Sequence, residues 1–248
     1  MKLRKYCQDH LKLLSDFYGN LYLYLEIVLL NPSSFAMQDF INTIQQRLQD
    51  PLPGIEAQMK MISNKLAAPL GTQSRFKVPE THKKASVLAL LYQKSGAWHL
   101  ALMQRPESPF AHSRQVSFPG GGAEEGDMDE SHTALRETEE EFGIPKEKIN
   151  LLGKLTQVYI PVSNYLVHPF VGYMNEEPVF NPDPNEVEHI VEVLLSDLLD
   201  PANRKIKEIE VHGGVKLPDV PYFHLSDKTI WGATAMMLSE LAEILNVD

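Results

Sequence analysis

The chain has 248 residues, of which 43% are hydrophobic, so it is long enough to form one large domain around a sizeable core. Its formal net charge of -10 and its pI near 5.4 argue against a protein that binds a nucleic-acid backbone, because that affinity comes mostly from clustered Lys and Arg. The only cysteine, Cys7, cannot form an internal disulfide, so we expect a protein of the reducing cytoplasm.

Residues 1–36 read as an extension that precedes the main domain. Their most apolar run, "LYLYLEIVLL", is about half as long as the roughly 20 residues of a membrane-spanning helix and contains a glutamate, so we expect a packed helix and no membrane partner. The breaker cluster "NPSSF" follows, and apolar residues recur at helical spacing from Met37 until shortly before Pro51. We predict a helical extension over 1–36 that the chemistry does not need, and a main domain over 37–248.

Two β-rich runs come next and flank a tight turn. "ASVLALLYQ" (Ala85–Gln93) and "AWHLALMQR" (Ala97–Arg105) lie on either side of Lys94, Ser95 and Gly96. Apolar and β-branched runs separated by such a turn are typical of paired strands. The sequence therefore predicts a hairpin here.

The loop "PESPFAHSRQVSFPGGG" ends in a turn that a ligand can approach closely. Pro119 fixes its own φ angle, and the glycines from Gly120 to Gly122 allow positive φ and close contact between a ligand and the backbone. An acidic helix follows this turn. We expect Asp127 to cap its first turn and Gly143 to end it.

The stretch "RETEEEFGI", Arg136–Ile144, places like charges side by side on that helix. Glu137, Glu140 and Glu141 are spaced i, i+3 and i+4, so they share one sector beside the apolar stripe. Each pair of like charges destabilises the bare helix by a few tenths of a kcal/mol, so the arrangement opposes folding unless a cation binds it. Such carboxylates suit Mg²⁺ or Mn²⁺, hard ions that also bind phosphates, whereas the alternative interpretation is a solvated acidic face.

Further strands and helices complete the chain. "NLLGKLTQVYIPV" (Asn150–Val162) and "YLVHPFVGYM" (Tyr165–Met174) are strand-like, and "VEHIVEVLLSDLLD" reads as a strand that enters a short helix. The chain closes on "TAMMLSELAEIL", which we expect to be an amphipathic helix. Strands before, between and after helices predict an α/β or α+β sandwich. The histidines at four positions form no recognisable ligand set: His168, His189, His212 and His224.

The glycine-rich turn, the helix and its glutamates together resemble the Nudix hydrolases, whose box reads G-x5-E-x7-R-E-U-x-E-E-x-G-U, with U an apolar residue. The second half of the box matches at Arg136, Glu137, Glu140, Glu141, Gly143 and Ile144, with Thr138 at the first U. In the first half Met128 stands where the box has Glu, and the nearest acid, Asp127, is one residue early. This offset resembles the coenzyme A pyrophosphatase branch of the family.

The same branch has an upstream signature, roughly L-L-T-x-R-S-x3-R-x3-G-x3-F-P-G-G. "LMQRPESPFAHSRQVSFPGG" follows it at Leu102, at Arg105 and over "QVSFPGG". It departs at Phe110, where the signature has Arg, and at Arg114, where it has Gly. We expect Arg114 to bind phosphate in place of the signature arginine that Phe110 replaces, although an arginine cannot adopt a backbone open only to glycine. The likeness runs from about Met37 to the C-terminus.

The resemblance implies a Nudix-type α/β/α sandwich with a mixed β-sheet and a loop-helix-loop catalytic motif. It also implies Mg²⁺- or Mn²⁺-dependent hydrolysis of the diphosphate bond of coenzyme A or its thioesters, giving 3′,5′-ADP and 4′-phosphopantetheine. On this basis the metal is assigned to Glu137, Glu141 and Glu140, catalysis to Glu140, Arg136 and Glu186, and substrate binding to Arg105, His112, Arg114, Gly120 and Gly121. The family implies a homodimer as well.

Several roles and substrates stay open. Glu140 is an additional metal ligand or the group that orients water, Arg136 holds the carboxylates in place, and the general base comes from the helix or from Glu186 or Glu188 in the loop "NPDPNEVEHI". The substrate alternatives are ADP-ribose, NADH and a dNTP. A third alternative is a Nudix protein that senses a nucleotide without hydrolysing it, and the complete set of glutamates argues against that.

Overall fold

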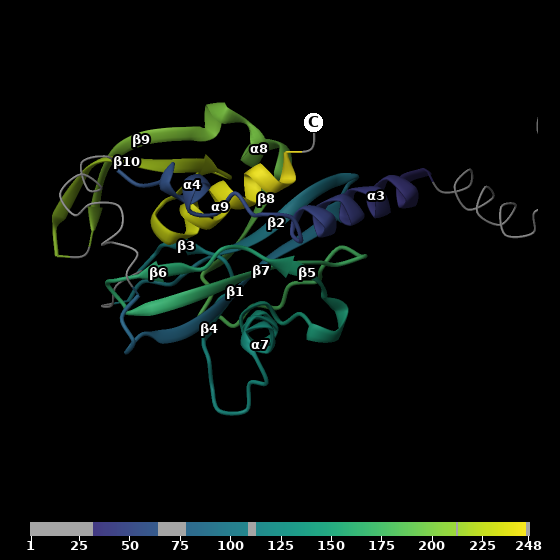
Figure 1. The fold of residues 1–248 in the computed structure, drawn as a ribbon, viewed down its shortest axis with the longest axis horizontal. Coiled ribbons are helices and arrows are strands. Elements are labelled where there is room, and N and C mark those ends of the chain that lie inside the picture. Colours follow the sequence, from purple (N-terminus) through teal and green to yellow (C-terminus); the bar gives the residue numbers. More distant parts are fainter. Residues whose placement is uncertain (1–31, 64–77, 109–112, 212, 247–248) are drawn as a thin grey trace, which may run out of the picture. The chain divides into compact units, whose positions relative to one another are not determined.

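The computed structural model describes residues 32–63, 78–108, 113–211 and 213–246, and the chain divides into two compact units, Met1–Gln46 and Arg47–Asp248 (Figure 1). Helix α3 spans Pro32–Arg47. The expected break at "NPSSF" was therefore wrong, because the first turn of a helix tolerates proline, whose missing N–H has no helical partner there. The expected helix in residues 1–31 lies outside the described residues, and the dispensability of 1–36 stays a prediction.

A mixed eight-stranded sheet dominates the second unit. Its strands are β1 (Lys83–Lys94), β2 (Ala97–Gln104), β3 (Val116–Ser117), β4 (Gly120–Gly122), β5 (Asn150–Lys154), β6 (Val158–Ile160), β7 (Tyr165–Tyr173) and β8 (His189–Leu194). The order is β3-β2-β1-β7-β5, with β4 on β1, β6 on β7 and β8 on β2. β1 and β7 run parallel, whereas the other pairs are antiparallel. The mixed sheet expected from the resemblance is confirmed.

The predicted hairpin is formed by β1 and β2. Leu90 pairs with Ala101, and Lys94 pairs with Ala97 at the turn. Ser95 and Gly96 have φ angles of 52° and 79°. Positive φ at both central residues is what a two-residue turn needs to match the twist of its strands.

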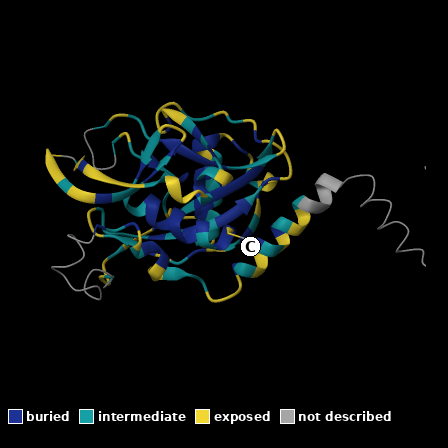
Figure 2. Ribbon diagram, turned by 90° about the horizontal axis from the view of Figure 1, so that it is seen from above, coloured by how far each residue is buried: buried dark blue, intermediate teal, exposed yellow. Residues whose placement is uncertain are grey.

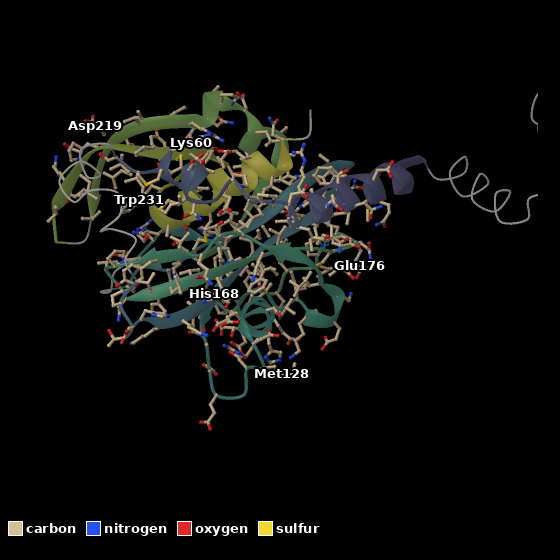
Figure 3. The ribbon with its side chains drawn as sticks, in the orientation of Figure 1. Lys60, Met128, His168, Glu176, Asp219 and Trp231 are labelled. Carbon is tan, nitrogen blue, oxygen red and sulfur yellow. The ribbon has the colours of Figure 1, made fainter. Side chains whose placement is uncertain are left out.

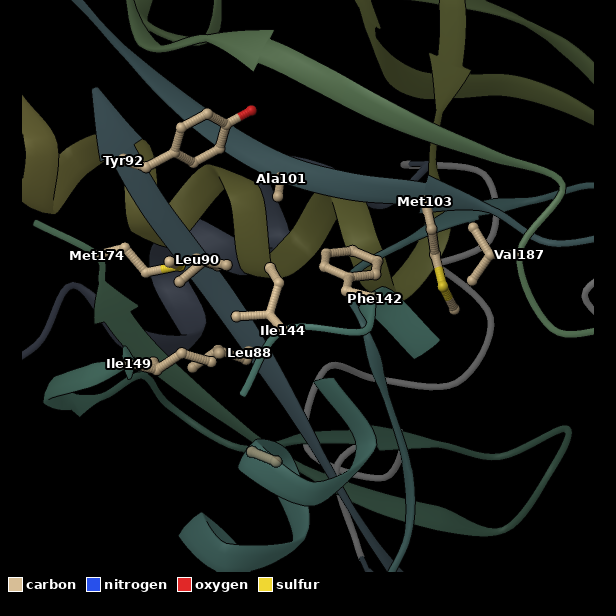
Figure 4. Close-up of a cluster of buried hydrophobic side chains, with 11 residues drawn as sticks. Leu88, Leu90, Tyr92, Ala101, Met103, Phe142, Ile144, Ile149, Met174 and Val187 are labelled. Atoms are coloured by element: carbon tan, nitrogen blue, oxygen red, sulfur yellow. The ribbon is translucent and has the colours of Figure 1, made fainter. Parts of the chain in front are cut away.

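Helix α7 (Glu130–Phe142) packs on one side of this sheet, and α9 (Gly232–Leu245) lies on the other (Figure 1). Strand β1 is buried continuously from Leu88 to Tyr92, as a strand covered on both faces must be. Its even-numbered residues face α7. Together with α7 they form a buried cluster of Leu88, Leu90, Tyr92, Ala101, Met103, Ala134, Phe142, Ile144, Ile149, Met174 and Val187 (Figure 4). We call this side of the sheet the α7 face.

The closing helix α9 differs from the expected amphipathic helix. All its residues from Thr234 to Leu245 except Glu243 are buried. Even Glu240 has 0% exposure, because its carboxylate accepts hydrogen bonds from Gln58 Nε2 at 2.9 Å and from the backbone N–H groups of Gly54 and Thr156. A buried carboxylate with several donors is satisfied, so a glutamate does not mark a solvent face here.

Shorter elements and a second sheet complete the unit. They are α4 (Gly54–Met59), η1 (Lys146–Lys148), α8 (Leu195–Leu199), η2 (Pro201–Asn203) and the antiparallel strands β9 (Arg204–Val211), β10 (Val215–Leu225) and β11 (Lys228–Ile230). Figure 2 shows much of the β9–β10 ribbon exposed, whereas the central strands are buried. Within the described ranges, no helix combines the length and apolarity that a membrane crossing requires.

Candidate active site

The turn before α7 brings its backbone against two glutamates of the helix. Gly120 has φ 149°, and its N–H donates to Glu141 Oε2 at 2.7 Å. A Cβ at Gly120 would collide with the carbonyl oxygen of Ser86 on β1, and a Cβ at Gly121 would lie 2.5 Å from both carboxylate oxygens of Glu137. Glycine is therefore required at both positions for the turn to approach the helix this closely.

The ends of α7 are set by two short motifs. The Asp129 carboxylate accepts from the N–H of His132 at 2.9 Å and caps the first turn. The expected cap at Asp127 was wrong, because the side chain of Asp127 is held by other donors, described next. At the other end Gly143 adopts φ 66°, and its N–H donates to the Glu139 carbonyl at 2.9 Å, so the expected end is confirmed.

Asp127 and Arg136 form a charge-matched cluster at one edge of the helix. Arg136 Nε donates to Asp127 Oδ1 and Arg136 Nη2 to Asp127 Oδ2, both at 3.0 Å, which is a bidentate pair. Thr133 and His132 also contact this carboxylate, at 2.9 and 3.0 Å. The Arg136 guanidinium, with these further donors, holds the pKa of Asp127 far below its usual range. We call these residues, together with Glu140, the Asp127–Arg136 cluster.

Glu140 belongs to this cluster, and Arg136 Nη1 lies close to both Glu140 and Glu137. Its Oε2 accepts from Arg136 Nη1 at 2.9 Å, one helical turn away, and its side chain is 53% exposed. Arg136 Nη2 also donates to the carbonyl of Gly122 at 3.0 Å. Arg136 thus ties the helix to the glycine turn, in keeping with the expectation that it holds neighbouring groups in place.

Glu137 and Glu141 form a site whose negative charge is not matched in this way, and we call it the Glu137–Glu141 pair. Their exposures are 9% and 0%. Burial raises the pKa of Glu141 to about 8, and it raises that of Glu137 although Arg136 Nη1 lies 3.1 Å from Glu137 Oε1. Glu141 Oε1 is buried and accepts no hydrogen bond from any residue that the structure describes, and the positive charge on Arg105 Nη2 is 3.9 Å away. Negative charge in this pair is poorly compensated.

The Glu137–Glu141 pair fits a hard divalent cation. Among the described residues no three His, Cys, Asp or Glu side chains are already arranged as a metal site. Mg²⁺ does not need such a cage, because it is usually held by one or two carboxylates together with waters and substrate phosphates. The unpartnered Glu141 Oε1 and the neighbouring Glu137 carboxylate supply this kind of oxygen donor. The donor chemistry and the uncompensated charge both match Mg²⁺ or Mn²⁺.

A second loop docks beside the pair and carries Glu186. The N–H groups of Asn181 and Asp183 donate to the carbonyls of Phe142 and Glu141, at 2.9 and 3.2 Å. Glu186 is exposed, and its charge contributes to the raised pKa values of both buried glutamates. The loop therefore presents a solvated carboxylate within electrostatic reach of the pair.

The basic residues expected to bind substrate occupy different surroundings. Arg105 lies beside Glu141, as described above, with a side chain 36% exposed. Arg114 has φ 55°, a left-handed conformation that residues other than glycine adopt at some energetic cost, so this position is not restricted to glycine. Its guanidinium lies 3.6 Å from the carboxylate of Glu107, and both side chains are largely exposed. His112, together with Phe110, lies outside the described residues.

Sequence reasoning missed two features of this site. It did not find the partnership of Asp127 with Arg136, although an acid just before a helix and nine residues before an arginine was a usable signal. It also missed the docking of the 181–187 loop on the end of α7, for which only the turn-forming "NPDPN" gave a hint.

Comparison with known proteins gives consistent matches. The sequence model of the NUDIX domain matches residues 82–210. The chain is 35% identical over 170 residues to Nudix hydrolase 22, chloroplastic, of Arabidopsis thaliana, covering 66% of this chain and 55% of that protein. It is 34% identical over 148 residues to the uncharacterized Nudix hydrolase NudL of Photorhabdus laumondii, covering 60% of this chain and 78% of that one.

The matches also differ in extent. The chain spans 55% and 58% of the lengths of the two Arabidopsis thaliana relatives, Nudix hydrolase 22 and Nudix hydrolase 15. Among solved structures, a Nudix hydrolase from M. Smegmatis, RenU, aligns with a TM-score of 0.44 and 17% identity, over 66% of this chain and 85% of the other.

Proposed function

The chain belongs to the Nudix family, and from this premise we propose that it is a divalent-metal-dependent hydrolase of the diphosphate bond in coenzyme A or its thioesters. Water attacks one phosphorus of the diphosphate, the bridging P–O bond breaks, and the products are 3′,5′-ADP and 4′-phosphopantetheine or its acyl form. The observation that carries the proposal is the Glu137–Glu141 pair. Its carboxylates are buried against a glycine turn, and their negative charge is poorly compensated. A structural helix face would not bury these charges.

Some residues of the site are assigned to metal binding, and others position those ligands. Glu137 and Glu141 would hold the cation, which when bound would offset the negative charge of the diphosphate. Gly120 fixes the Glu141 carboxylate through its N–H, so that Oε1 is the oxygen left for a ligand. Arg136 is a positioning residue, because it joins the helix to Asp127 and to the Gly122 carbonyl.

Proton transfer is assigned to the 181–187 loop. Glu186 is solvated and close enough to influence the pair, so its carboxylate can accept a proton from the attacking water. Glu140 is the less suitable group, because Arg136 already donates to its Oε2. It keeps the roles expected from the sequence, an additional metal ligand or the group that orients the water.

The coenzyme A assignment rests on the upstream signature and on Arg105. The stretch "QVSFPGG" and Arg105 follow the coenzyme A pyrophosphatase branch, and Arg105 is the cation beside Glu141. A guanidinium there can bind a phosphate oxygen of the same diphosphate. Arg114 contributes less to this argument, because its charge faces Glu107 at the surface.

A product assay tests the proposal. Purified protein with Mg²⁺ is offered coenzyme A, ADP-ribose, NADH and dATP at equal concentrations, and products are separated by chromatography. We expect coenzyme A to be cleaved with the highest kcat/KM, and 3′,5′-ADP to accumulate.

Two other outcomes redefine the function. Faster cleavage of ADP-ribose, NADH or dATP rejects the coenzyme A assignment and keeps the diphosphate chemistry. No cleavage of any of them, in protein that still binds Mg²⁺, identifies a nucleotide sensor instead.

A further inference from the structure

A cavity opens at the edge of the large sheet, at the connection between β5 and β6. Its volume is about 410 Å³. It is lined by Leu52, Ile55, Val78, Lys154, Leu155, Thr156, Gln157, Tyr159, Leu166, His168 and Pro169. The lining thus combines an apolar wall with nitrogen donors, and its described residues include no Asp or Glu although the whole chain has a net charge of -10. We call it the His168 cavity.

His168 supplies a hydrogen-bond donor that nothing described in the protein uses. Gln157 Nε2 donates to His168 Nδ1 at 3.2 Å, which places the proton of the neutral ring on Nε2. Burial lowers the pKa of His168, which favours the neutral ring. Nε2 is buried and has no hydrogen-bond partner among the described residues. A buried donor of this kind is satisfied when a ligand brings an acceptor oxygen.

One wall of the cavity, at His168, shares a face of the sheet with the Glu137–Glu141 pair. Ser86 on β1 pairs with Gly121 on one side and with His168 on the other. Paired residues point to the same face, and a Cβ at Gly121 would point at the Glu137 carboxylate. His168 is therefore on the α7 face of β7 (Figure 3), two strand spacings, or about 10 Å, from the backbone that contacts Glu137.

We propose that the His168 cavity receives the pantetheine arm of a coenzyme A substrate whose diphosphate lies at the Glu137–Glu141 pair. The arm is a largely apolar chain with two amide carbonyls, so it matches an apolar wall with an unused N–H donor and the amine of Lys154. Its backbone has the length of about four peptide residues, or roughly 13 Å when extended, which covers the distance between the two sites. This inference rests on the proposed function for the substrate, and on the cavity for where the arm binds.

Binding of the isolated arm tests the inference without any turnover. Pantetheine, which lacks phosphate, is titrated into the metal-free full chain and followed by NMR, with 3′,5′-ADP as the second ligand. We expect His168→Phe to weaken pantetheine binding about tenfold, because it removes the donor and keeps an aromatic ring. His168→Gln retains an N–H at similar reach and should stay within about threefold of the parent. His224→Phe, in the second sheet, is the matched control and should change nothing.

Several results would overturn the assignment. Pantetheine affinity that is unchanged in His168→Phe removes the cavity from the binding site, and loss of 3′,5′-ADP affinity instead assigns it to the nucleotide. If His168→Phe does not fold, Lys154→Ala replaces it, since Lys154 is exposed, and unchanged pantetheine binding in that variant also rejects the inference.

Failure of the cavity and failure of the proposed function give different results. Coenzyme A hydrolysis with a KM that His168→Phe does not raise rejects the cavity alone. Pantetheine binding that depends on His168, in a protein that does not hydrolyse coenzyme A, rejects the proposed function alone.

Discussion

Two groups of charges in the same loop-helix-loop behave in opposite ways. In the Asp127–Arg136 cluster the Asp127 carboxylate has an arginine in bidentate contact and further donors, and its pKa is depressed. In the Glu137–Glu141 pair, whose members directly follow Arg136 and Glu140 in the helix, the carboxylates are buried with few partners, and the pKa of Glu141 is raised to about 8. The first group stabilises the loop-helix-loop whatever is bound. The second destabilises it until a cation or a proton neutralises it.

The largest effect should come from removing the charge of the pair. Glu141→Gln should lower kcat by about 100-fold or more, because a group that holds the charge-stabilising cation is lost. Glu139→Gln is the matched control on the same helix, because Glu139 is only partly buried and lies 3.9 Å from Lys146. The activity of this variant should stay within about twofold of the parent. Equal losses of kcat in the two variants would show that the Glu137–Glu141 pair matters no more for activity than a glutamate on the helix surface.

Breaking the matched cluster should affect folding more than chemistry. Asp127→Ala leaves the guanidinium of Arg136, whose side chain is 16% exposed, without its bidentate partner. We expect a loss of about 2 kcal/mol in the free energy of unfolding, measured with urea. Glu125→Ala removes an exposed acid from the same loop and should change stability by less than about 0.5 kcal/mol. A loss in Asp127→Ala no larger than in this control would show that the cluster is not structural.

The two groups should also differ in how stability depends on pH. The folded-state pKa of Glu141 is raised from 4.5 to about 8, so its contribution is fully present below pH 4.5 and is lost as pH rises through 8. Asp127, with its depressed pKa, contributes fully above its ordinary value of 3.8 and loses its contribution only in stronger acid.

Metal-free protein should therefore lose up to about 1.4 kcal/mol of stability per pH unit between pH 5 and 8 because of Glu141. Denaturation in EDTA at three pH values measures this slope, and Glu141→Gln should flatten it. A slope that is identical in the variant would mean that Glu141 is not the group that titrates.

The smallest effect concerns the helix cap. Asp129→Ala should cost about 1 kcal/mol, because the N–H of His132 loses its acceptor, whereas Asp129→Asn retains an oxygen and should cost a few tenths. Thermal melts of the two variants provide the measurement. If the alanine variant is as stable as the asparagine variant, the cap does not stabilise α7.

Local patterns in the sequence were sufficient for much of this helix and for the hairpin. The end at Gly143 and the turn at Ser95 and Gly96 depend on conformations that a few neighbouring residues determine, so they could be predicted. The cap could not be assigned between Asp127 and Asp129, because that depends on where Arg136 reaches once the loop has folded.

Tertiary burial limited the other predictions. Glu137, Glu140 and Glu141 share a helical sector in sequence, yet the turn at Gly120 and Gly121 covers two of them and leaves Glu140 to Arg136. In the same way, the sequence predicted an amphipathic α9, yet Glu240 is buried because its partners Gln58, Gly54 and Thr156 come from distant segments. Spacing on one helix does not contain this information.

The central claim is that the Glu137–Glu141 pair is destabilising until it binds a cation, and one comparison of melting curves tests it directly. Parent and Glu141→Gln are unfolded at pH 8 in EDTA and again in saturating Mg²⁺. Without metal the variant should be at least as stable as the parent, because a buried charge has been removed. With Mg²⁺ at about 100 times Kd the parent should gain about 2.7 kcal/mol and become the more stable protein. An equal gain in both proteins, or a parent more stable in EDTA, would contradict the account.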